Sequence, residues 1–309
     1  MATLADLAEL VRAPAALSVP GDVVAGAAAA GVLDRRTPAL AGASVLLYWA
    51  GMAANDWADR RLDAVERPER PIPSGRVHPG AAVGLAAGLT AAGLGLAAAA
   101  GGRRATAVAV PLAVAVWGYD LRAKNTAAGP AVMAACRGLD VLLGAAGGRL
   151  SRALPAALTV AAHTWTVTAL SRREVTGADV TLPLGTLAGT ALVATSAVTA
   201  PRPRPTRPPA DGDVTVRSAP ALRSRRAALA AALPAALTAW YAAGYGRAQA
   251  RVVADPSAGR VRAAVGAGIT GLPALQGALT ARSGAGLLGL AVAAAAPLGR
   301  RLARRVSPT

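Results

Sequence analysis

Apolar segments follow one another along almost the whole chain and are separated by short charged interruptions. A helix of about 20 apolar residues spans the hydrocarbon core of a membrane. Ten candidate segments cover residues 17–33, 41–54, 79–100, 105–119, 130–146, 153–170, 182–200, 227–245, 263–279 and 285–298. Several are shorter than a full span, so the pattern predicts ten spans, plus or minus one. The predicted fold is an all-α polytopic transmembrane helical bundle, with residues 1–309 forming one integral-membrane domain.

The composition supports a membrane protein and argues against other classes. Hydrophobic residues make up 54% of the 309 residues and charged residues only 16%, whereas a soluble domain carries about 25% charged residues. The apolar content is also far above that of disordered chains. A net charge of +17 could indicate nucleic-acid binding, but the arginines are spread between apolar segments and few aromatic residues could stack on bases. We therefore expect the lipid bilayer as a partner, and no nucleic acid.

The distribution of basic residues predicts an orientation in the membrane. Cytoplasmic loops of membrane proteins carry an excess of Lys and Arg. When the loop after the second apolar segment is placed in the cytoplasm, most basic residues fall on the inner side, apart from those in a Pro/Arg-rich loop at 201–226. We therefore expect a multi-pass protein of the inner or plasma membrane, with the loops after 41–54 and 153–170 facing the cytoplasm.

Asp56, Asp59 and Asp63 follow the second apolar segment at a spacing of i, i+3 and i+7. On a helix that continues past the segment, this spacing places the three carboxylates on one face. Carboxylates on one face repel each other unless a cation lies between them, and Mg²⁺ bridges carboxylates to substrate phosphates. The spacing therefore favours a Mg²⁺ site. The alternative is a solvated helix end whose charge is neutralised by Arg60 and Arg61.

An arginine- and proline-rich loop follows these aspartates. It has the sequence Glu66-Arg67-Pro68-Glu69-Arg70-Pro71-Ile72-Pro73-Ser74-Gly75-Arg76. The planar guanidinium group forms paired hydrogen bonds with phosphate oxygens, and Arg70 is our candidate for this role. Metal ligands and phosphate-binding arginines next to each other at a membrane surface suggest a diphosphate carried on a lipid.

The aspartates and the loop together resemble the first signature of the UbiA-type intramembrane prenyltransferase superfamily. The first half is Asn55-Asp56-x-x-Asp59-x-x-x-Asp63, and the second half runs from Arg70 to Arg76. The resemblance implies a bundle of about nine transmembrane helices around a central cavity that is open towards the bilayer. It also implies Mg²⁺-dependent transfer of a prenyl group from an isoprenyl diphosphate to an acceptor. The three aspartates would be catalytic metal ligands, and Asn55 would orient the ion and the diphosphate.

A further element follows the fourth apolar segment. Tyr119-Asp120-Leu121-Arg122-Ala123-Lys124 resembles the superfamily's Tyr…Lys element, which contacts the diphosphate. The resemblance makes Tyr119, Arg122 and Lys124 candidate substrate-binding residues. Lys124 is the sole lysine of the chain, and its alternative role is that of a positive anchor on the cytoplasmic side.

The segment after 153–170 occupies the place of the superfamily's second acidic motif. It reads Ser171-Arg172-Arg173-Glu174-Val175-Thr176-Gly177-Ala178-Asp179, a form that resembles a bacterial, Ebo-like branch of the superfamily. The usual pair of aspartates is reduced to Glu174 and Asp179, whose i, i+5 spacing does not place them on one helical face. The resemblance implies that Glu174 is a catalytic ligand of a second Mg²⁺. Asp179 either completes that site or caps a helix that begins near Thr181.

Four ionisable residues interrupt the apolar segments, namely Asp22, Arg137, Asp140 and His163. Such groups are costly in hydrocarbon and usually face a partner or a cavity. Arg137 and Asp140 are i, i+3 neighbours, and they form an intrahelical ion pair, part of the substrate cavity, or both. Asp22 either binds the polar head of the acceptor or starts a helix. His163 either packs in the core or borders the cavity.

The expected function is prenyl transfer inside the membrane. Mg²⁺ and the cationic side chains of Arg70, Arg122 and Lys124 would stabilise the diphosphate leaving group, and an apolar cavity would keep water from the allylic cation. The sequence does not identify the acceptor. Two alternatives remain: a membrane transporter or scaffold without catalytic activity, and the same fold transferring a phosphoribosyl-type group to a lipid phosphate.

Overall fold

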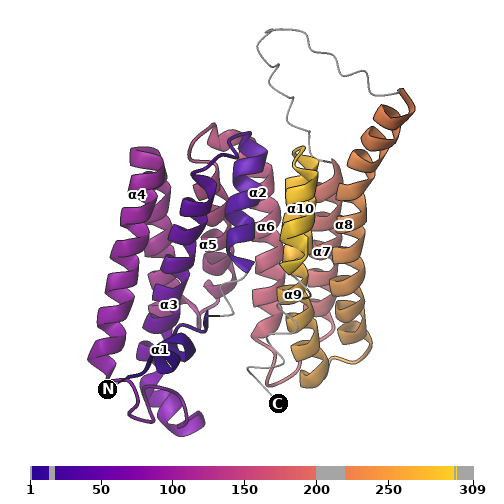
Figure 1. Cartoon of the computed structure of the whole chain (residues 1–309). Coiled ribbons are helices and arrows are strands. Elements are labelled where there is room, and N and C mark those ends of the chain that lie inside the picture. Colours follow the sequence, from indigo (N-terminus) through magenta and orange to yellow (C-terminus); the bar gives the residue numbers. More distant parts are fainter. Residues whose placement is uncertain (1, 14–17, 200–219, 296, 298–309) are drawn as a thin grey trace.

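The computed structural model describes residues 2–13, 18–199, 220–295 and 297, with side chains of the third stretch described from residue 232 onward. The regular elements in these stretches are all helical (Figure 1), which confirms the predicted all-α class for this part of the chain. They are α1 (Leu4–Leu10), α2 (Pro20–Ala30), α3 (Thr37–Glu66), α4 (Pro79–Gly118), the π-helical turn η2 (Tyr119–Ala123), α5 (Gly129–Gly144), α6 (Leu150–Ser171), α7 (Thr181–Thr199), α8 (Pro220–Ala254), α9 (Ala258–Arg282) and α10 (Gly286–Ala293).

The element α4 consists of two helices that reverse direction at Gly102. This residue has φ 60° and ψ −152°, a conformation that is open only to glycine. Trp117 Nε1 donates to Thr90 Oγ1 at 3.0 Å. A straight helix, rising 1.5 Å per residue, would separate these two residues by about 40 Å. The apolar segments predicted at 79–100 and 105–119 are therefore two antiparallel helices.

Small residues allow α2 and α5 to pack backbone against backbone. A Cβ at Gly26 of α2 would collide with the carbonyl of Val141, and a Cβ at Gly144 of α5 would collide with the carbonyl of Val23. Close contact of this kind is typical of helices packed within lipid, where burial of apolar surface drives little association. The tight pairing of α2 and α5 fixes the position of ionisable residues that both helices carry.

The two acidic motifs lie at the same end of the bundle. Lys124, which follows η2, donates to Asp59 at the end of α3. Two residues farther along the same loop, the carbonyl of Thr126 accepts a hydrogen bond from Arg172, which directly follows α6. The second acidic motif, 174–179, continues from this point. The loops that carry the two motifs are thus tied together through the segment 124–126.

In the part of the chain that the structure describes, four helical stretches are long and apolar enough to cross a membrane: α3, Pro79–Ala123 (which contains the reversal at Gly102), α6 and α7. Large apolar side chains such as Val114, Leu158 and Leu192 are exposed, as expected for residues that face lipid. α2 and α10 contain 11 and 8 residues, fewer than the ~20 of a full span. The Pro/Arg-rich loop expected at 201–226 falls outside the described residues up to 219, and α8 begins at Pro220.

Candidate active site

The last turns of α3 carry the predicted acidic face, which consists of Asp56, Asp59 and Asp63. α3 continues to Glu66, so the three aspartates lie on one side of a regular helix, as their spacing predicts. Asp56 and Asp63 are buried, with 4% and 3% of their surface exposed. Buried carboxylates require charged or hydrogen-bonding partners, and each of the three has such a partner.

Arg70 lies between the outer two aspartates. Its Nη1 donates to Asp63 Oδ2 at 2.6 Å and lies 3.5 Å from Asp56 Oδ1. The loop that carries it is folded tightly, because Ser74 Oγ donates to the carbonyl of Arg70 at 2.7 Å. Two carboxylates of the acidic face therefore bracket one cationic nitrogen.

Lys124 pairs with the middle aspartate. Its Nζ donates to Asp59 Oδ1 at 2.6 Å and to Asn55 Oδ1 at 2.8 Å. Lys124 directly follows the π-helical turn η2, and such wide turns often occur at functional sites. The structure thus brings Asn55 and Lys124 together at the acidic face. Arg122 of the same turn is exposed, and its side chain forms no hydrogen bond with another described residue.

Arg12 is a third cation at the acidic face and was not predicted from the sequence. Its Nη2 donates to Asp56 Oδ1 at 2.8 Å, and its φ of 46° is uncommon for a residue other than glycine. The preceding helix α1 is tied to the loop after α3, because Arg76 pairs with Asp6 and with Glu9, each at 2.7 Å. No local spacing could have linked Arg12 to a carboxylate so distant in the sequence.

The alternative of a helix end neutralised by Arg60 and Arg61 is wrong. The Arg60 guanidinium donates to the carbonyl of Trp57 and lies over the Trp57 ring, 4.7 Å from its centroid. Arg61 is exposed. The charges that neutralise the acidic face come instead from three segments outside α3: the N-terminal segment, the loop after α3 and the loop after η2.

A fourth carboxylate, Asp120, approaches α3 from η2. A Cβ at Gly51 would lie only 2.7 Å from Asp120 Oδ2, so the glycine leaves the room that this side chain needs. Gly51 lies about one helical turn before Asn55. The position of Asp120 between Tyr119 and Lys124 gave no signal for this contact, since the contact depends on how η2 packs against α3.

The second acidic motif provides one helix cap and one carboxylate without a fixed partner. Asp179 Oδ1 accepts hydrogen bonds from the Leu182 N–H at 3.1 Å and from Thr181 Oγ1 at 2.8 Å, and these bonds lower the pKa of Asp179. The helix-cap alternative is therefore confirmed. Glu174 is partly buried; burial raises the pKa of its carboxyl, and Arg262 opposes the rise. Within the described ranges, no three His, Cys, Asp or Glu side chains form a group that could hold a metal ion.

A cavity of about 310 Å³ lies next to the acidic face, among α3, η2, α5, α6, α9 and the two residues that precede α2. Met52 and Tyr119 line it, and Met52 precedes Asn55 by about one turn of α3. Much of the remaining wall is apolar and includes Val167 and Leu272. The predicted Tyr119 therefore borders a chamber that begins one helical turn from the acidic face.

The cavity has a polar floor, made of Tyr48 and Arg137, which line it, and Asp22 and Asp140, which are buried beside Arg137. Arg137 Nε lies 2.7 Å from Asp22 Oδ2, so the ion pair joins α5 to α2. The intrahelical pair with Asp140, one of the two alternatives, is not formed; Asp140 accepts a hydrogen bond from Ser44 of α3. Asp22 lies in the first turn of α2. Neither carboxylate lines the cavity itself.

His163 belongs both to the core and to the cavity wall. Its Nδ1 forms a hydrogen bond of 2.8 Å with the Tyr241 hydroxyl, and only 1% of the residue is exposed. The rings of Tyr241 and Tyr245 pack edge-on against the imidazole, with centroids 5.2 and 5.4 Å away. The two alternatives for this histidine are therefore not exclusive.

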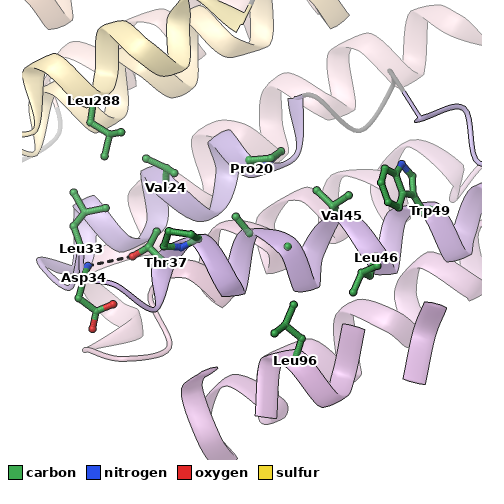
Figure 2. A pocket seen from close by; sticks show the side chains of 13 residues that line it. Pro20, Val24, Leu33, Asp34, Thr37, Val45, Leu46, Trp49, Leu96 and Leu288 are labelled. Carbon is green, nitrogen blue, oxygen red and sulfur yellow. Dashed lines mark hydrogen bonds between the residues drawn. The ribbon is translucent and has the colours of Figure 1, made fainter. Parts of the chain in front are cut away.

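A wider, apolar groove of about 920 Å³ lies between α2, α3, α4 and α10 (Figure 2). Val45 and Trp49 of α3 line it together with Leu96 of α4 and Leu288 of α10. Trp49 also lines the inner cavity. A single side chain therefore borders both the groove and the inner cavity.

Parts of the chain are similar to known synthases. A digeranylgeranylglyceryl phosphate synthase from Methanothrix thermoacetophila is 48% identical over 69 residues, which are 22% of this chain and 25% of that protein. The one from Methanopyrus kandleri is 38% identical over 108 residues, 35% of this chain and 38% of that protein. A bacteriochlorophyll synthase 33 kDa chain from Cereibacter sphaeroides is 54% identical over 35 residues, 11% and 12% of the two chains. The chain thus matches less than two fifths of the length of each relative.

Two solved structures share the fold over most of both chains. A structure described as giving structural and mechanistic insights into digeranylgeranylglyceryl phosphate synthase in membranes has a TM-score of 0.64 and 15% identity, covering 91% of this chain and 98% of that one. A UbiA homolog from Aeropyrum pernix K1 has a TM-score of 0.57 and 18% identity, covering 89% and 96%. At this identity the similarity establishes the helical fold.

The family model described as the UbiA prenyltransferase family matches residues 17–175, slightly more than half of the chain. This range includes the acidic face, the loop with Arg70, the Tyr…Lys element and Glu174. The resemblance noted from the two signature halves is thereby confirmed. The chain belongs to the UbiA prenyltransferase family.

Proposed function

We propose that this protein is a Mg²⁺-dependent prenyltransferase that moves a prenyl group from an isoprenyl diphosphate to an acceptor inside the membrane. The observation that carries the proposal is the acidic face beside the cavity. Its three carboxylates pair with three cationic side chains from other segments, Arg12, Arg70 and Lys124, about one helical turn from a largely apolar chamber. The names of the relatives, synthases of digeranylgeranylglyceryl phosphate and of bacteriochlorophyll, suggest the same class of reaction.

The donor set of the acidic face fits a Mg²⁺ ion. The carboxylate and amide oxygens of Asp56, Asp59, Asp63 and Asn55 are hard ligands of the kind that Mg²⁺ prefers. Asp56 and Asp63 bracket one nitrogen of Arg70, at 3.5 and 2.6 Å, so the two carboxylates already hold a cationic group between them, and an ion would take this place after Arg70 moves away. These residues would hold the ion, which when bound would supply positive charge to stabilise the diphosphate as a leaving group.

Glu174 is our candidate ligand for a second ion. Its carboxyl is partly buried at the same end of the bundle and has no hydrogen-bond partner among the described residues. Asp179 is the weaker candidate, because one of its oxygens already caps α7. We therefore assign the second motif one ligand.

Arg12, Arg70 and Lys124 would bind the diphosphate oxygens directly. Each donates to an aspartate at 2.6 to 2.8 Å, a distance typical of strong charge-assisted hydrogen bonds. A diphosphate competes with the aspartates for the same donors. When the cations turn to phosphate oxygens, the aspartates become free to bind metal. Arg122 is exposed and would join the three only after changing its rotamer.

The bond changes in the proposed reaction follow from this arrangement. The bond between the first prenyl carbon and the diphosphate oxygen breaks, and its electron pair leaves with the diphosphate, whose charge the three cations neutralise. A nucleophilic atom of the acceptor forms the new bond to that carbon, and its proton passes to a diphosphate oxygen. Met52, Val167 and Leu272 on the cavity wall would exclude water from the allylic cation.

The prenyl chain would extend from the acidic face through the cavity and past Trp49 into the apolar groove of Figure 2. A chain too long for the inner cavity could thus remain in contact with lipid. We further propose that the protein lies in the inner or plasma membrane with its acidic face in the cytoplasm, because the arginine distribution favours that orientation.

The direct test uses purified protein in lipid nanodiscs with labelled isoprenyl diphosphates and a lysate extract as the acceptor source, with Mg²⁺ or with EDTA. We expect release of diphosphate and a new labelled product, both abolished by EDTA. A matched control is Asp255→Asn, which removes an exposed carboxylate. Asp255 lies in the loop between α8 and α9 and pairs with Arg260 of α9. Turnover of this variant should equal that of the wild type.

The same assay separates the alternatives. Absence of diphosphate release at every Mg²⁺ concentration would favour a transporter or scaffold. Consumption of a phosphoribosyl diphosphate in preference to all isoprenyl diphosphates would favour transfer of a phosphoribosyl-type group to a lipid phosphate.

A further inference from the structure

The ionisable part of the polar floor consists of two carboxylates and one arginine. Arg137 pairs with Asp22 at 2.7 Å, Gln276 Nε2 donates to Asp22 Oδ1 at 2.6 Å, and Ser44 donates to Asp140. Asp22 and Asp140 are 0% exposed, and Arg137 is 6% exposed. The positive charge of Arg137 is therefore compensated within the protein.

This charge balance leaves no free cation for an anionic ligand. If Asp22 and Asp140 share one proton, the three groups together are neutral; if both are ionised, the group carries one negative charge. His163, also on the cavity wall, is enclosed, and its Nδ1 is already hydrogen-bonded to Tyr241. A carboxylate or phosphate placed against the floor would add a negative charge beside two carboxylates in a low-dielectric interior, which is costly.

The floor nevertheless contains a buried hydroxyl that lacks a hydrogen-bond partner among the described residues. Tyr48 is 8% exposed and lines the cavity, and no described residue is hydrogen-bonded to its hydroxyl. An unpaired buried hydroxyl is unfavourable. Arg137 lies over the Tyr48 ring, 5.5 Å from its centroid, and uses Nη2 for the carbonyl of Ser18 at 3.1 Å. A guanidinium has five N–H donors, so Arg137 retains donors for a ligand.

We infer that the polar floor binds the acceptor through a neutral hydroxyl group, and that the protein selects uncharged alcohols or phenols over acceptors that carry a carboxylate or phosphate. The inference rests on the proposed prenyl transfer. A hydroxyl oxygen can accept from Arg137 while its proton is donated to the Tyr48 oxygen, which satisfies both groups without adding charge. Asp22 is a positioning residue that orients Arg137, and Asp22 and Asp140 together compensate its charge.

The same arrangement separates the two substrates by charge. The cationic side chains of Arg12, Arg70 and Lys124 all lie at the acidic face. Tyr48 lies two turns before Asn55 on α3, about 10 Å away along the helix axis. The anionic diphosphate is therefore attracted to the end of the cavity at the acidic face. The uncharged acceptor binds at the other end, against the polar floor.

The test measures binding and needs no turnover. Purified protein in nanodiscs is titrated with two matched pairs of probes: 4-hydroxybenzyl alcohol against 4-hydroxybenzoate, and 1-O-octylglycerol against its phosphate. Inorganic diphosphate and Mg²⁺ are present throughout, so that the cations of the acidic face are occupied. We expect the neutral member of each pair to bind at least about tenfold more tightly, since its rival must place a charge beside two carboxylates.

Three variants assign this preference to the floor. Tyr48→Phe should weaken the neutral probes about three- to tenfold, the usual effect of losing one hydrogen bond. Tyr245→Phe is the matched control, because it removes a buried hydroxyl that contacts Thr166 and does not line the cavity. Asp140→Asn keeps an oxygen for Ser44 but removes one negative charge, so it should narrow the preference by improving binding of the anionic probes.

Tighter or equal binding of the anionic probes to the wild type would overturn the inference, as would unchanged binding of the neutral probes to Tyr48→Phe. Tyr48→Phe preserves the ring and its packing, so the test stands even if Asp140→Asn does not fold. Diphosphate release together with a preference for the anionic probes would contradict the inference of an uncharged acceptor but not the proposed prenyl transfer. A preference for neutral probes without any diphosphate release would instead contradict the proposed function.

Discussion

Lys124, the sole lysine of the chain, donates to Asp59 Oδ1 at 2.6 Å although 65 residues separate the two. Only 15% of the lysine side chain is exposed, which does not suit an anchor at a lipid surface. The contact joins two sequence elements that resemble the family independently, the acidic face and the Tyr…Lys element. Their meeting point is where we place the diphosphate.

Arg12 tests whether the cations of the acidic face bind the diphosphate. Arg12→Gln removes the charge beside Asp56, and we expect the KM for the isoprenyl diphosphate to rise about tenfold, equivalent to about 1.4 kcal/mol. Arg61→Gln is the matched control, since Arg61 is exposed. Steady-state kinetics would contradict the assignment if both variants had the KM of the wild type.

The stability of α1 at acidic pH tests whether the ion pair between Asp6 and Arg76 holds this helix in place. Hydrogen bonds from the Thr3 backbone and side chain and from Arg76 lower the pKa of Asp6 from 3.8 to about 2. A lowered pKa contributes stability that is present above pH 3.8 and is lost as the pH falls towards 2. Hydrogen exchange should therefore show α1 protected at pH 5 and less protected near pH 2.

Asp6→Asn provides the comparison for this experiment. It should show weak protection of α1 already at pH 5, because the charge-assisted bond to Arg76 is absent. Equal protection of the variant and the wild type at pH 5 would mean that Asp6 does not hold α1 in place.

The topology follows from the arginine distribution and the shared end of the two motifs. Glu66→Cys and Thr176→Cys, each on a Cys136→Ala background, should both be labelled from the cytoplasmic side by a membrane-impermeant maleimide. Labelling of the two positions from opposite sides would separate the acidic motifs and rule out a common site.

The second motif is tested by two conservative changes. Glu174→Gln deletes a charge but keeps a hydrogen-bonding oxygen, and we expect turnover to fall about 100-fold or more, comparable to loss of a preorganised charge-stabilising group. Asp179→Asn should cost much less, because Asn caps helices nearly as well as Asp. A higher Mg²⁺ concentration should partly restore the turnover of Glu174→Gln but not that of Asp179→Asn. Equal, small losses in turnover would show that the second motif binds no catalytic ion.

Features set by neighbours along the chain could be predicted from the sequence. The common face of Asp56 and Asp63 depends only on α3 continuing past its apolar part, and α3 does continue to Glu66. The reversal within α4 likewise separates two apolar segments at a glycine that can adopt the required backbone conformation. In both cases the helical period and local backbone freedom decide the outcome.

Contacts between distant segments could not be predicted. Arg137 has Asp140 as its near neighbour on α5 but pairs with Asp22, because α2 and α5 approach at backbone distance where Gly26 and Gly144 lack side chains. The same limit applies to Arg12, which reaches Asp56 through the docking of α1. Partner choice for buried charges is thus a property of packing, and spacing along one helix does not decide it.

The most direct measurement of the central claim is turnover of Asp59→Asn, with labelled isoprenyl diphosphate in nanodiscs and Mg²⁺ varied. Asp59 contacts Lys124, and the variant keeps an oxygen acceptor for that bond. We predict at least about a 100-fold loss of diphosphate release, with a wild-type melting temperature and normal activity of the Asp255→Asn control. Wild-type turnover and an unchanged Mg²⁺ requirement in Asp59→Asn would contradict the assignment of the acidic face as the catalytic metal site.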